Sequence, residues 1–290
     1  MIPYFSGHIR DLNLPIIGKF AIHWFGVLVA VGVIIGDRIV VMQGRRRGLD
    51  PNDVKYMNAR IVIGGFIVAH LVSVIFYFPE RIAKDWTLLF NPFAGLSSFG
   101  GFLGAFLAFL YYTKKADIPR LPYADSVALG LSIGWIFGRT GCFTAHDHPG
   151  RRVSASFFLS VNFPEGPRID LGLYELLFTI VLTAILFNYN RRPRPPGRII
   201  ALAALIYAPA RFVLDFFRAT DVPRPDQRYL ALTPAQWACL ATAGLGIYLW
   251  RRREPASPPP PAPPTPPDGQ ATPDEPAPPD APAPPATNES

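Results

Sequence analysis

The apolar run VALGLSIGWIF, from Val127 to Phe137, carries no charged side chain and leads directly into GRTGCFTAHDHPG, from Gly138 to Gly150. The second stretch brings an arginine, a cysteine, two histidines and an aspartate close together in the sequence. Its glycines and its proline are typical of interrupted backbone structure. Together the two stretches predict a membrane helix over about Leu121 to Phe137 that opens into a polar, reactive loop.

The composition of the whole chain predicts a polytopic membrane protein. Half of the 290 residues are hydrophobic and only 17% are charged, whereas about a quarter is usual in soluble domains. The net charge of +7 comes from short basic clusters between apolar runs, which are typical of cytoplasmic membrane loops rather than of a nucleic-acid groove. We therefore expect no nucleic-acid partner. The two cysteines, Cys142 and Cys239, give no disulfide framework.

Seven apolar segments predict transmembrane helices, so the expected fold is all-α. They cover about Phe20 to Met42, Met57 to Phe78, a third segment that ends near Tyr112 after a glycine-rich entry region, Leu121 to Phe137, Leu171 to Asn188, Ile199 to Phe217 and Leu232 to Trp250. Lysine and arginine are dense in alternate linkers and after the last segment. By the positive-inside rule, the N-terminus then lies outside and the C-terminus in the cytoplasm.

The sequence divides the chain into a seven-helix membrane domain, residues 1–253, and a proline-rich tail, residues 254–290. Residues 1–19, before the first helix, are expected to form a short interfacial piece. The tail holds 16 of the 33 prolines. Because such a composition cannot bury a core, we expect an extended, disordered cytoplasmic tail.

Ionisable side chains inside predicted membrane spans are functional candidates, because they are costly in a bilayer. Five such side chains, in or at the end of a predicted span, stand out: Asp125, Arg139, Glu175, Arg211 and Asp215. Arg211 and Asp215 share one helix face. They could form a buried ion pair that orients the helix, or Asp215 could position Arg211 to bind an anion, and the two roles are compatible. Arg139 either extends to lipid headgroups or clamps a phosphate with its planar guanidinium. Two arginines near the outer leaflet favour a phospholipid headgroup.

A short run of potential metal ligands follows Arg139. His146, Asp147 and His148 stand next to one another, with Cys142 four residues before them. This spacing is poor for a structural zinc site. A polar lid or a general base is the preferred interpretation, and we expect neither a metal nor another cofactor.

Segments along most of the chain resemble the prolipoprotein diacylglyceryl transferase family, the membrane enzymes of bacterial lipoprotein maturation. The segments, in chain order, are IHWFGVLVAVG (22–32), GGFIVAHLVSVIFY (64–77), SSFGGFLGAFLA (97–108), GRTGCF (138–143) with Gly150, LYE (173–175), RFVLDFFR (211–218) and LTPAQW (232–237).

The resemblance implies an enzyme of the bacterial inner membrane that acts on phosphatidylglycerol. The diacylglyceryl group would move to the lipobox cysteine thiol of a prolipoprotein, forming a thioether and releasing glycerol phosphate. One alternative is a divergent member that binds phosphatidylglycerol or lipoprotein precursors and transfers poorly. A small transporter is a further alternative, although the chain lacks the internal repeat that many transporters show.

By position, the resemblance implies that Arg139 binds phosphatidylglycerol and that Arg211 is a second essential arginine. Asp215 and Asp147 stand where the family usually has glutamate. The lipid site is also expected to include Glu175 and the glycines that give a headgroup or lipid room to approach, namely Gly138, Gly141, Gly150, Gly100 and Gly101. The last two would equally allow close helix packing.

Four further positions depart from the family pattern. Phe99 stands where a histidine is usual, Cys142 where an asparagine is usual, Phe25 where a tyrosine is common, and His70 where an arginine is usual. Because the histidine at position 99 is missing, we hypothesise that His146 or His148 replaces it as the proton acceptor.

Overall fold

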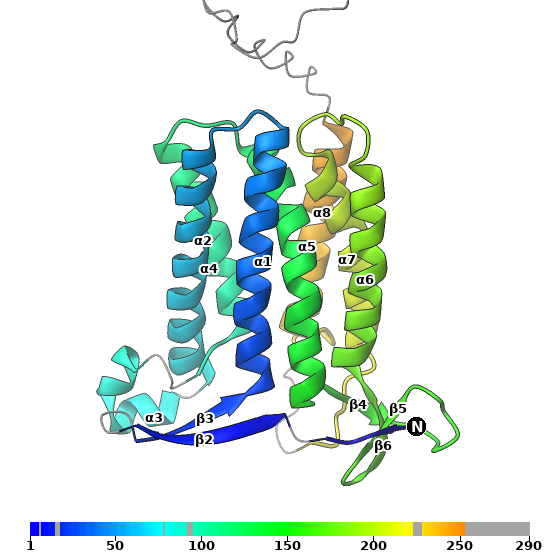
Figure 1. The fold of residues 1–290 in the computed structure, drawn as a ribbon. Coiled ribbons are helices and arrows are strands. Elements are labelled where there is room, and N and C mark those ends of the chain that lie inside the picture. Colours follow the sequence, from blue (N-terminus) through cyan, green and yellow to red (C-terminus); the bar gives the residue numbers. More distant parts are fainter. Residues whose placement is uncertain (6, 15–17, 78, 92–94, 223–227, 253–290) are drawn as a thin grey trace, which may run out of the picture. The chain divides into compact units, whose positions relative to one another are not determined.

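The structure, a computed structural model, describes the chain except for residues 6, 15–17, 78, 92–94, 223–227 and 253–290, so the predicted tail lies outside the described residues. Within the described part, seven helices of 18 residues or more alternate in direction (Figure 1). They are α1 (Trp24–Arg46), α2 (Pro51–Val72), α4 (Ser98–Lys115), α5 (Arg120–Ala145), α6 (Leu171–Tyr189), α7 (Arg198–Asp215) and α8 (Pro234–Arg251). Between α2 and α4 lie a π-helical turn (Ser73–Tyr77), the short helix α3 (Pro79–Lys84) and a 3₁₀ turn (Trp86–Phe90).

Several of the helices have the length and apolar character of membrane spans. In the described residues, three segments are long and apolar enough to cross a membrane: Trp24–Arg46, Pro51–Phe76 and Leu171–Tyr189. Large apolar side chains such as Phe66, Leu107 and Val181 are exposed on the helices, as expected of side chains that contact lipid.

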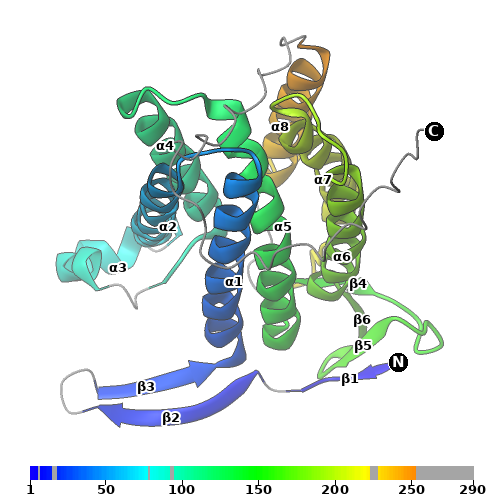
Figure 2. The ribbon, with the colours of Figure 1, turned by 45° about the horizontal axis from the view of Figure 1, so that its top comes forward.

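Two small β-sheets at one end of the bundle correct the all-α expectation (Figures 1 and 2). One has the strand order β1-β5-β6-β4 and is formed by β1 (Ile2–Pro3), β4 (Pro149–Arg152), β5 (Ser160–Phe163) and β6 (Gly166–Asp170). The other is an antiparallel hairpin of β2 (His8–Leu14) and β3 (Gly18–His23). These strands lie in the N-terminal segment, where a short interfacial piece was expected, and in the polar linker before α6. The strands of the larger sheet have only two to five residues, which give too little hydrophobic alternation to be recognised.

The expected reactive loop is largely helical, which is a second correction. α5 continues to Ala145, so residues 138–145 form its last two turns. Glycine weakens an isolated helix, but packing against the bundle stabilises this one. A Cβ at Gly141 would lie 3.1 Å from the Phe25 ring, which shows how closely α1 covers this turn. The helix ends at His146, whose φ of 50° is left-handed and reverses the chain towards β4.

Glycines set the close crossings within the bundle. Between α1 and α5, a Cβ at Gly130 would lie 2.3 Å from a methyl carbon of Val40 and 2.6 Å from the carbonyl oxygen of Gly36. Between α2 and α4, a Cβ at Gly104 would lie 2.3 Å from the carbonyl oxygen of Gly64. Small residues of this kind let helix backbones approach in membranes.

Asp125 of α5 serves as a remote cap for α7. Its carboxylate accepts hydrogen bonds from the backbone N–H groups of Gly197 at 2.8 Å, Ile199 at 3.0 Å and Ile200 at 2.9 Å. The residue before α7 is Gly197, which has no side chain to cap the helix. This buried acid therefore satisfies the orphan donors of a helix start, which is a structural role.

A bidentate ion pair ties the larger sheet to the segment after α7. Arg168 of β6 donates to both carboxylate oxygens of Asp221, at 2.8 and 2.7 Å. These hydrogen bonds hold the pKa of Asp221 well below its usual range. The N–H of Arg151 also donates to the carbonyl oxygen of Phe217 at 2.8 Å. The sheet is thus fixed beside the end of α7.

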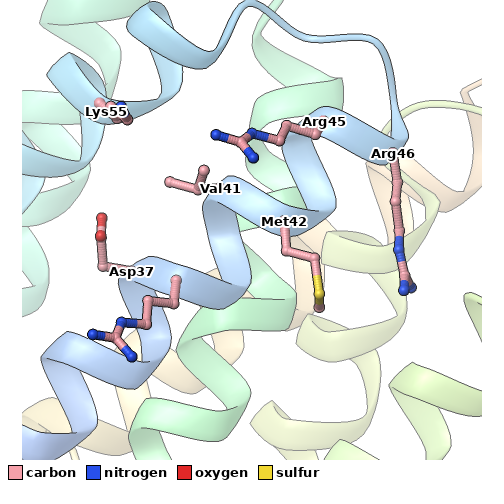
Figure 3. A pocket seen from close by; sticks show the side chains of 7 residues that line it. Asp37, Val41, Met42, Arg45, Arg46 and Lys55 are labelled. Atoms are coloured by element: carbon pink, nitrogen blue, oxygen red, sulfur yellow. The ribbon is translucent and has the colours of Figure 1, made fainter.

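Positive charge collects at the opposite end of the bundle. There, α1 and the start of α2 line an open pocket of about 480 Å³ (Figure 3). Its lining residues are Asp37, Arg38, Val41, Met42, Arg45, Arg46 and Lys55. Arg47, which follows α1, donates to the side-chain oxygen of Asn190 at 2.7 Å and so links this end to the end of α6.

Candidate active site

Two arginines from different helices meet at one carboxylate. A terminal nitrogen (Nη2) of Arg139 on α5 lies 2.7 Å from Oε1 of Glu175 on α6, and Nε of Arg211 on α7 lies 3.5 Å from Oε2. All three residues are buried. An unpaired charge at such a place is strongly unfavourable, so Glu175 holds both guanidinium groups at the junction of three helices.

The ion pair expected within α7 is present. Nη1 of Arg211 lies 2.8 Å from Oδ1 of Asp215. The hydroxyl of Thr233 donates to the other oxygen of Asp215, and Thr233 is also the N-cap of α8. Asp215 therefore orients Arg211 and connects the site to the start of α8.

Three further members of the site, Tyr207, Trp135 and Thr233, carry no charge and were not predicted from the sequence. The Tyr207 hydroxyl donates to Oε1 of Glu175 at 2.5 Å. The guanidinium of Arg139 lies over the Trp135 ring, 4.5 Å from its centroid. Thr233 is the third. Tyr207 and Trp135 each precede an arginine by four residues, so helical spacing is the signal that would have found them.

Two buried donors at the site have no hydrogen-bond partner among the residues that the structure describes. They are Nε of Arg139 and the indole nitrogen of Trp135. Leaving such a donor unsatisfied costs about 1–3 kcal/mol. The other terminal nitrogen of Arg139, Nη1, donates to the Cys142 sulfur at 3.6 Å. These two N–H groups could therefore donate hydrogen bonds to a bound ligand. Phosphate oxygens are suitable acceptors, because they accept strongly from guanidinium groups.

His146 is placed apart from the arginines, in an aromatic enclosure. Its Nδ1 lies 2.6 Å from a carboxylate oxygen of Asp170, and its ring stacks on Tyr4 with the centroids 4.4 Å apart. Phe143 and Phe163 contact the ring from other sides. These contacts fix the turn at the end of α5.

Asp147 and His148 lie beyond that turn, nearer to the surface. Their side chains are hydrogen-bonded, with 2.5 Å between Nδ1 of His148 and Oδ1 of Asp147. Asp147 is exposed and His148 is half-buried. Together with Cys142, they offer one ligand atom each within 4.8 Å of one another.

Packing fills the space beside three of the five glycines expected at the lipid site. A Cβ at Gly150 would lie 2.8 Å from the carbonyl oxygen of Ile169, and one at Gly100 would lie 2.7 Å from that of Val68. Gly141 packs against α1 in the same way. At Gly100, helix packing is therefore the better supported of the two alternatives. The glycines with ordinary contacts are Gly138 and Gly101.

The departures Phe99 and His70 lie near the start of α4 and in α2. The Phe99 side chain is exposed. His70 is buried, with ring nitrogens 3.3 Å from the carbonyl oxygen of Gly95 and 3.0 Å from that of Leu89. It therefore ties α2 to Leu89 and Gly95, which come before α4 in the chain.

Comparison with known proteins gives the same family along almost all of the helical part. The family described as prolipoprotein diacylglyceryl transferase matches residues 13–252. A phosphatidylglycerol–prolipoprotein diacylglyceryl transferase of Chromohalobacter salexigens is 32% identical over 248 residues, which are 82% of this chain and 91% of that protein. One from Nitratidesulfovibrio vulgaris is 32% identical over 258 residues, 84% of this chain and 94% of that protein. The chain belongs to the prolipoprotein diacylglyceryl transferase family.

Proposed function

We propose that the protein transfers the diacylglyceryl group of phosphatidylglycerol to the lipobox cysteine of a prolipoprotein. Family membership and the names of the relatives support this activity. The observation that carries it is the convergence of Arg139 and Arg211 on Glu175, beside unpaired donors. Guanidinium groups so placed suit the phosphate of an anionic lipid.

In the reaction, the acceptor sulfur forms a bond to the glycerol carbon of the diacylglyceryl group. The bond from that carbon to the phosphate oxygen breaks, and glycerol phosphate leaves with the electron pair. Arg139 and Arg211 stabilise the charge that develops on the phosphate. Asp215 keeps Arg211 in place at 2.8 Å.

The thiol must lose a proton, because the thiolate is the nucleophile. Phe99 cannot accept it, so the proton acceptor is assigned to the turn after α5. There, His148 is more accessible than His146, which is enclosed by aromatic rings. Full transfer activity in both His146→Ala and His148→Ala would contradict this assignment.

We further infer that all seven long helices span the bacterial inner membrane, with the N-terminus outside and the C-terminus in the cytoplasm. The basic pocket of α1 and α2 supports this orientation, since cytoplasmic loops are rich in lysine and arginine. Arg139 lies in the last turns of α5 and Glu175 near the start of α6, both towards the sheets. The site then faces the outer leaflet, where a prolipoprotein and phosphatidylglycerol meet.

A transfer assay tests the function with the purified full chain, labelled phosphatidylglycerol and a synthetic lipobox peptide. We expect Arg139→Ala and Arg211→Ala to lower kcat/KM at least about 100-fold, the loss typical for a removed transition-state donor. Arg60→Ala is the matched control. Arg60 is an exposed arginine of α2 that lies over the Tyr112 ring, and this variant should keep its activity.

Two outcomes would contradict the proposal. If the Arg139→Ala and Arg211→Ala variants both transferred as fast as the wild type, the two arginines would have no role in binding the phosphate. A wild type that binds phosphatidylglycerol in a lipid-binding assay but transfers nothing would favour the divergent binding protein.

A further inference from the structure

Cys142, Asp147 and His148 form a cluster of metal-ligating groups that the proposed site does not explain. One ligand atom of each lies within 4.8 Å of the other two. Cys142 is on α5, whereas Asp147 and His148 follow the left-handed residue His146. The reversal at His146 turns the later pair back towards the cysteine. Sequence spacing alone does not show this convergence.

The protein holds this turn in place independently of the three side chains. The buried ring of His146 is fixed by Asp170 at 2.6 Å. On the other side, the N–H of Leu171 donates to the carbonyl oxygen of His148 at 3.0 Å, and the N–H of Ala219 donates to that of Pro149 at 3.1 Å. The cluster is thus held by a rigid backbone, which favours ligand binding because little ordering remains to be done.

The three side chains are of the types that bind zinc. A thiolate, an imidazole and a carboxylate bind Zn²⁺ at about 2.0–2.3 Å, so ligand atoms in a tetrahedral site lie about 3.3–3.8 Å apart. Nδ1 of His148 and Oδ1 of Asp147 lie 2.5 Å apart in a hydrogen bond, which zinc would displace. Rotation of these two side chains would then bring the three ligand atoms, which lie within 4.8 Å of one another, to tetrahedral spacing. Three protein ligands leave one position open, as in catalytic rather than structural zinc sites.

We propose that Cys142, Asp147 and His148 bind one zinc ion whose open position accepts the thiolate of the prolipoprotein cysteine. The second half of this inference rests on the proposed function. A thiol that coordinates zinc releases its proton to solvent, so a thiolate forms although position 99 is a phenylalanine. His148 then assists the loss of the proton as a zinc ligand, and solvent takes the proton in place of the His148 ring. The Cys142 sulfur lies 3.6 Å from Nη1 of Arg139, so the nucleophile would be held beside the group that binds the phosphate.

Metal content of the purified full chain in detergent is the first test. After loading with zinc, we expect about one equivalent per chain by mass spectrometry of metals. Cys142→Ser and His148→Gln should lose most of it. Cys239→Ser is the matched control, because Cys239 is the other buried cysteine, and it should retain the metal. Zinc content in the wild type that equals that of Cys142→Ser would overturn the site.

Cobalt replaces zinc to report the sulfur ligand. The cobalt-loaded wild type should show a thiolate-to-metal charge-transfer absorption that Cys142→Ser lacks. Adding a lipobox peptide should increase this absorption, whereas the same peptide with serine in place of cysteine should not. An unchanged spectrum with the cysteine peptide would overturn thiolate binding.

These readouts separate the zinc inference from the proposed function, because neither requires transfer. Transfer activity in a protein that binds no metal would overturn the zinc site and leave the function standing. If the cobalt spectrum depended on Cys142 but the protein transferred nothing, the zinc site would stand and the proposed function would be overturned.

Discussion

At the scale of single residues, Glu175 determines the charge balance of the site. It is paired with Arg139 at 2.7 Å and with Arg211 at 3.5 Å, and it accepts from the Tyr207 hydroxyl. Asp215 pairs with Arg211 at 2.8 Å and with Arg218 at 3.7 Å, so three positive groups meet two negative ones. A bound phosphate therefore competes with Glu175 for the same guanidinium donors, and the carboxylate keeps the arginines in place when no lipid is bound.

We expect Glu175→Gln to lower both stability and transfer. Removing one partner of a buried ion pair costs about 3–5 kcal/mol, since the other charge is left uncompensated. Thermal unfolding in detergent and the transfer assay measure the two effects. Glu165→Gln, in the exposed turn between β5 and β6, is the control and should leave both unchanged. An unfolding temperature equal to that of the wild type would argue against Glu175 as the shared counter-ion.

The charged members of the site could be predicted from the sequence, but their pairing could not. An arginine or a glutamate in an apolar run is conspicuous, because the bilayer makes it costly. The partner of Arg139 is Glu175, on the next long helix, rather than Asp147 in its own segment. That choice depends on how α5 and α6 pack. Tyr207 and Trp135 carry no charge, so only their position on a helix face marks them.

At the scale of elements, the crossing of α1 and α5 depends on the absence of a side chain at Gly130. We expect Gly130→Ala to destabilise the protein, because its Cβ would lie 2.6 Å from the carbonyl oxygen of Gly36. Gly244→Ala in α8 is the matched substitution, since its Cβ would meet nothing within 4 Å. It should be neutral or stabilising by about 0.5–1 kcal/mol, the usual gain in a helix interior. Unfolding temperatures in detergent compare the two, and equal shifts would contradict the packing argument.

The elements show where sequence patterns stop being informative. The apolar runs identify the helices correctly, but α5 extends past Phe137 to Ala145 through two glycines and two threonines. Contacts with α1, such as that between Gly141 and Phe25, stabilise those turns, and no local pattern reports them. The short strands that cover this end are likewise fixed by tertiary contacts such as the pair of Arg168 and Asp221.

At the scale of the whole molecule, the two ends of the bundle differ in kind. One end carries the sheets and, near them, the arginine site, and the other carries the basic pocket of α1 and α2 (Figures 1 and 3). This asymmetry is what the positive-inside rule requires of a protein whose chemistry takes place on the outer face. The proposed orientation therefore predicts which end is reached by a reagent that cannot cross the membrane.

Single cysteines placed at the two ends test that orientation. In a background of Cys142→Ser and Cys239→Ser, we expect Ser156→Cys, between β4 and β5, to react with a membrane-impermeant maleimide added to cells with a permeabilised outer membrane. Arg192→Cys, between α6 and α7, should react only after the inner membrane is opened. Both positions are exposed, so burial would not explain a difference. α6 is the one helix between the two positions, and the long helices of the bundle alternate in direction (Figure 1). The reverse labelling pattern would therefore invert the whole topology and move the arginine site to the cytoplasmic face.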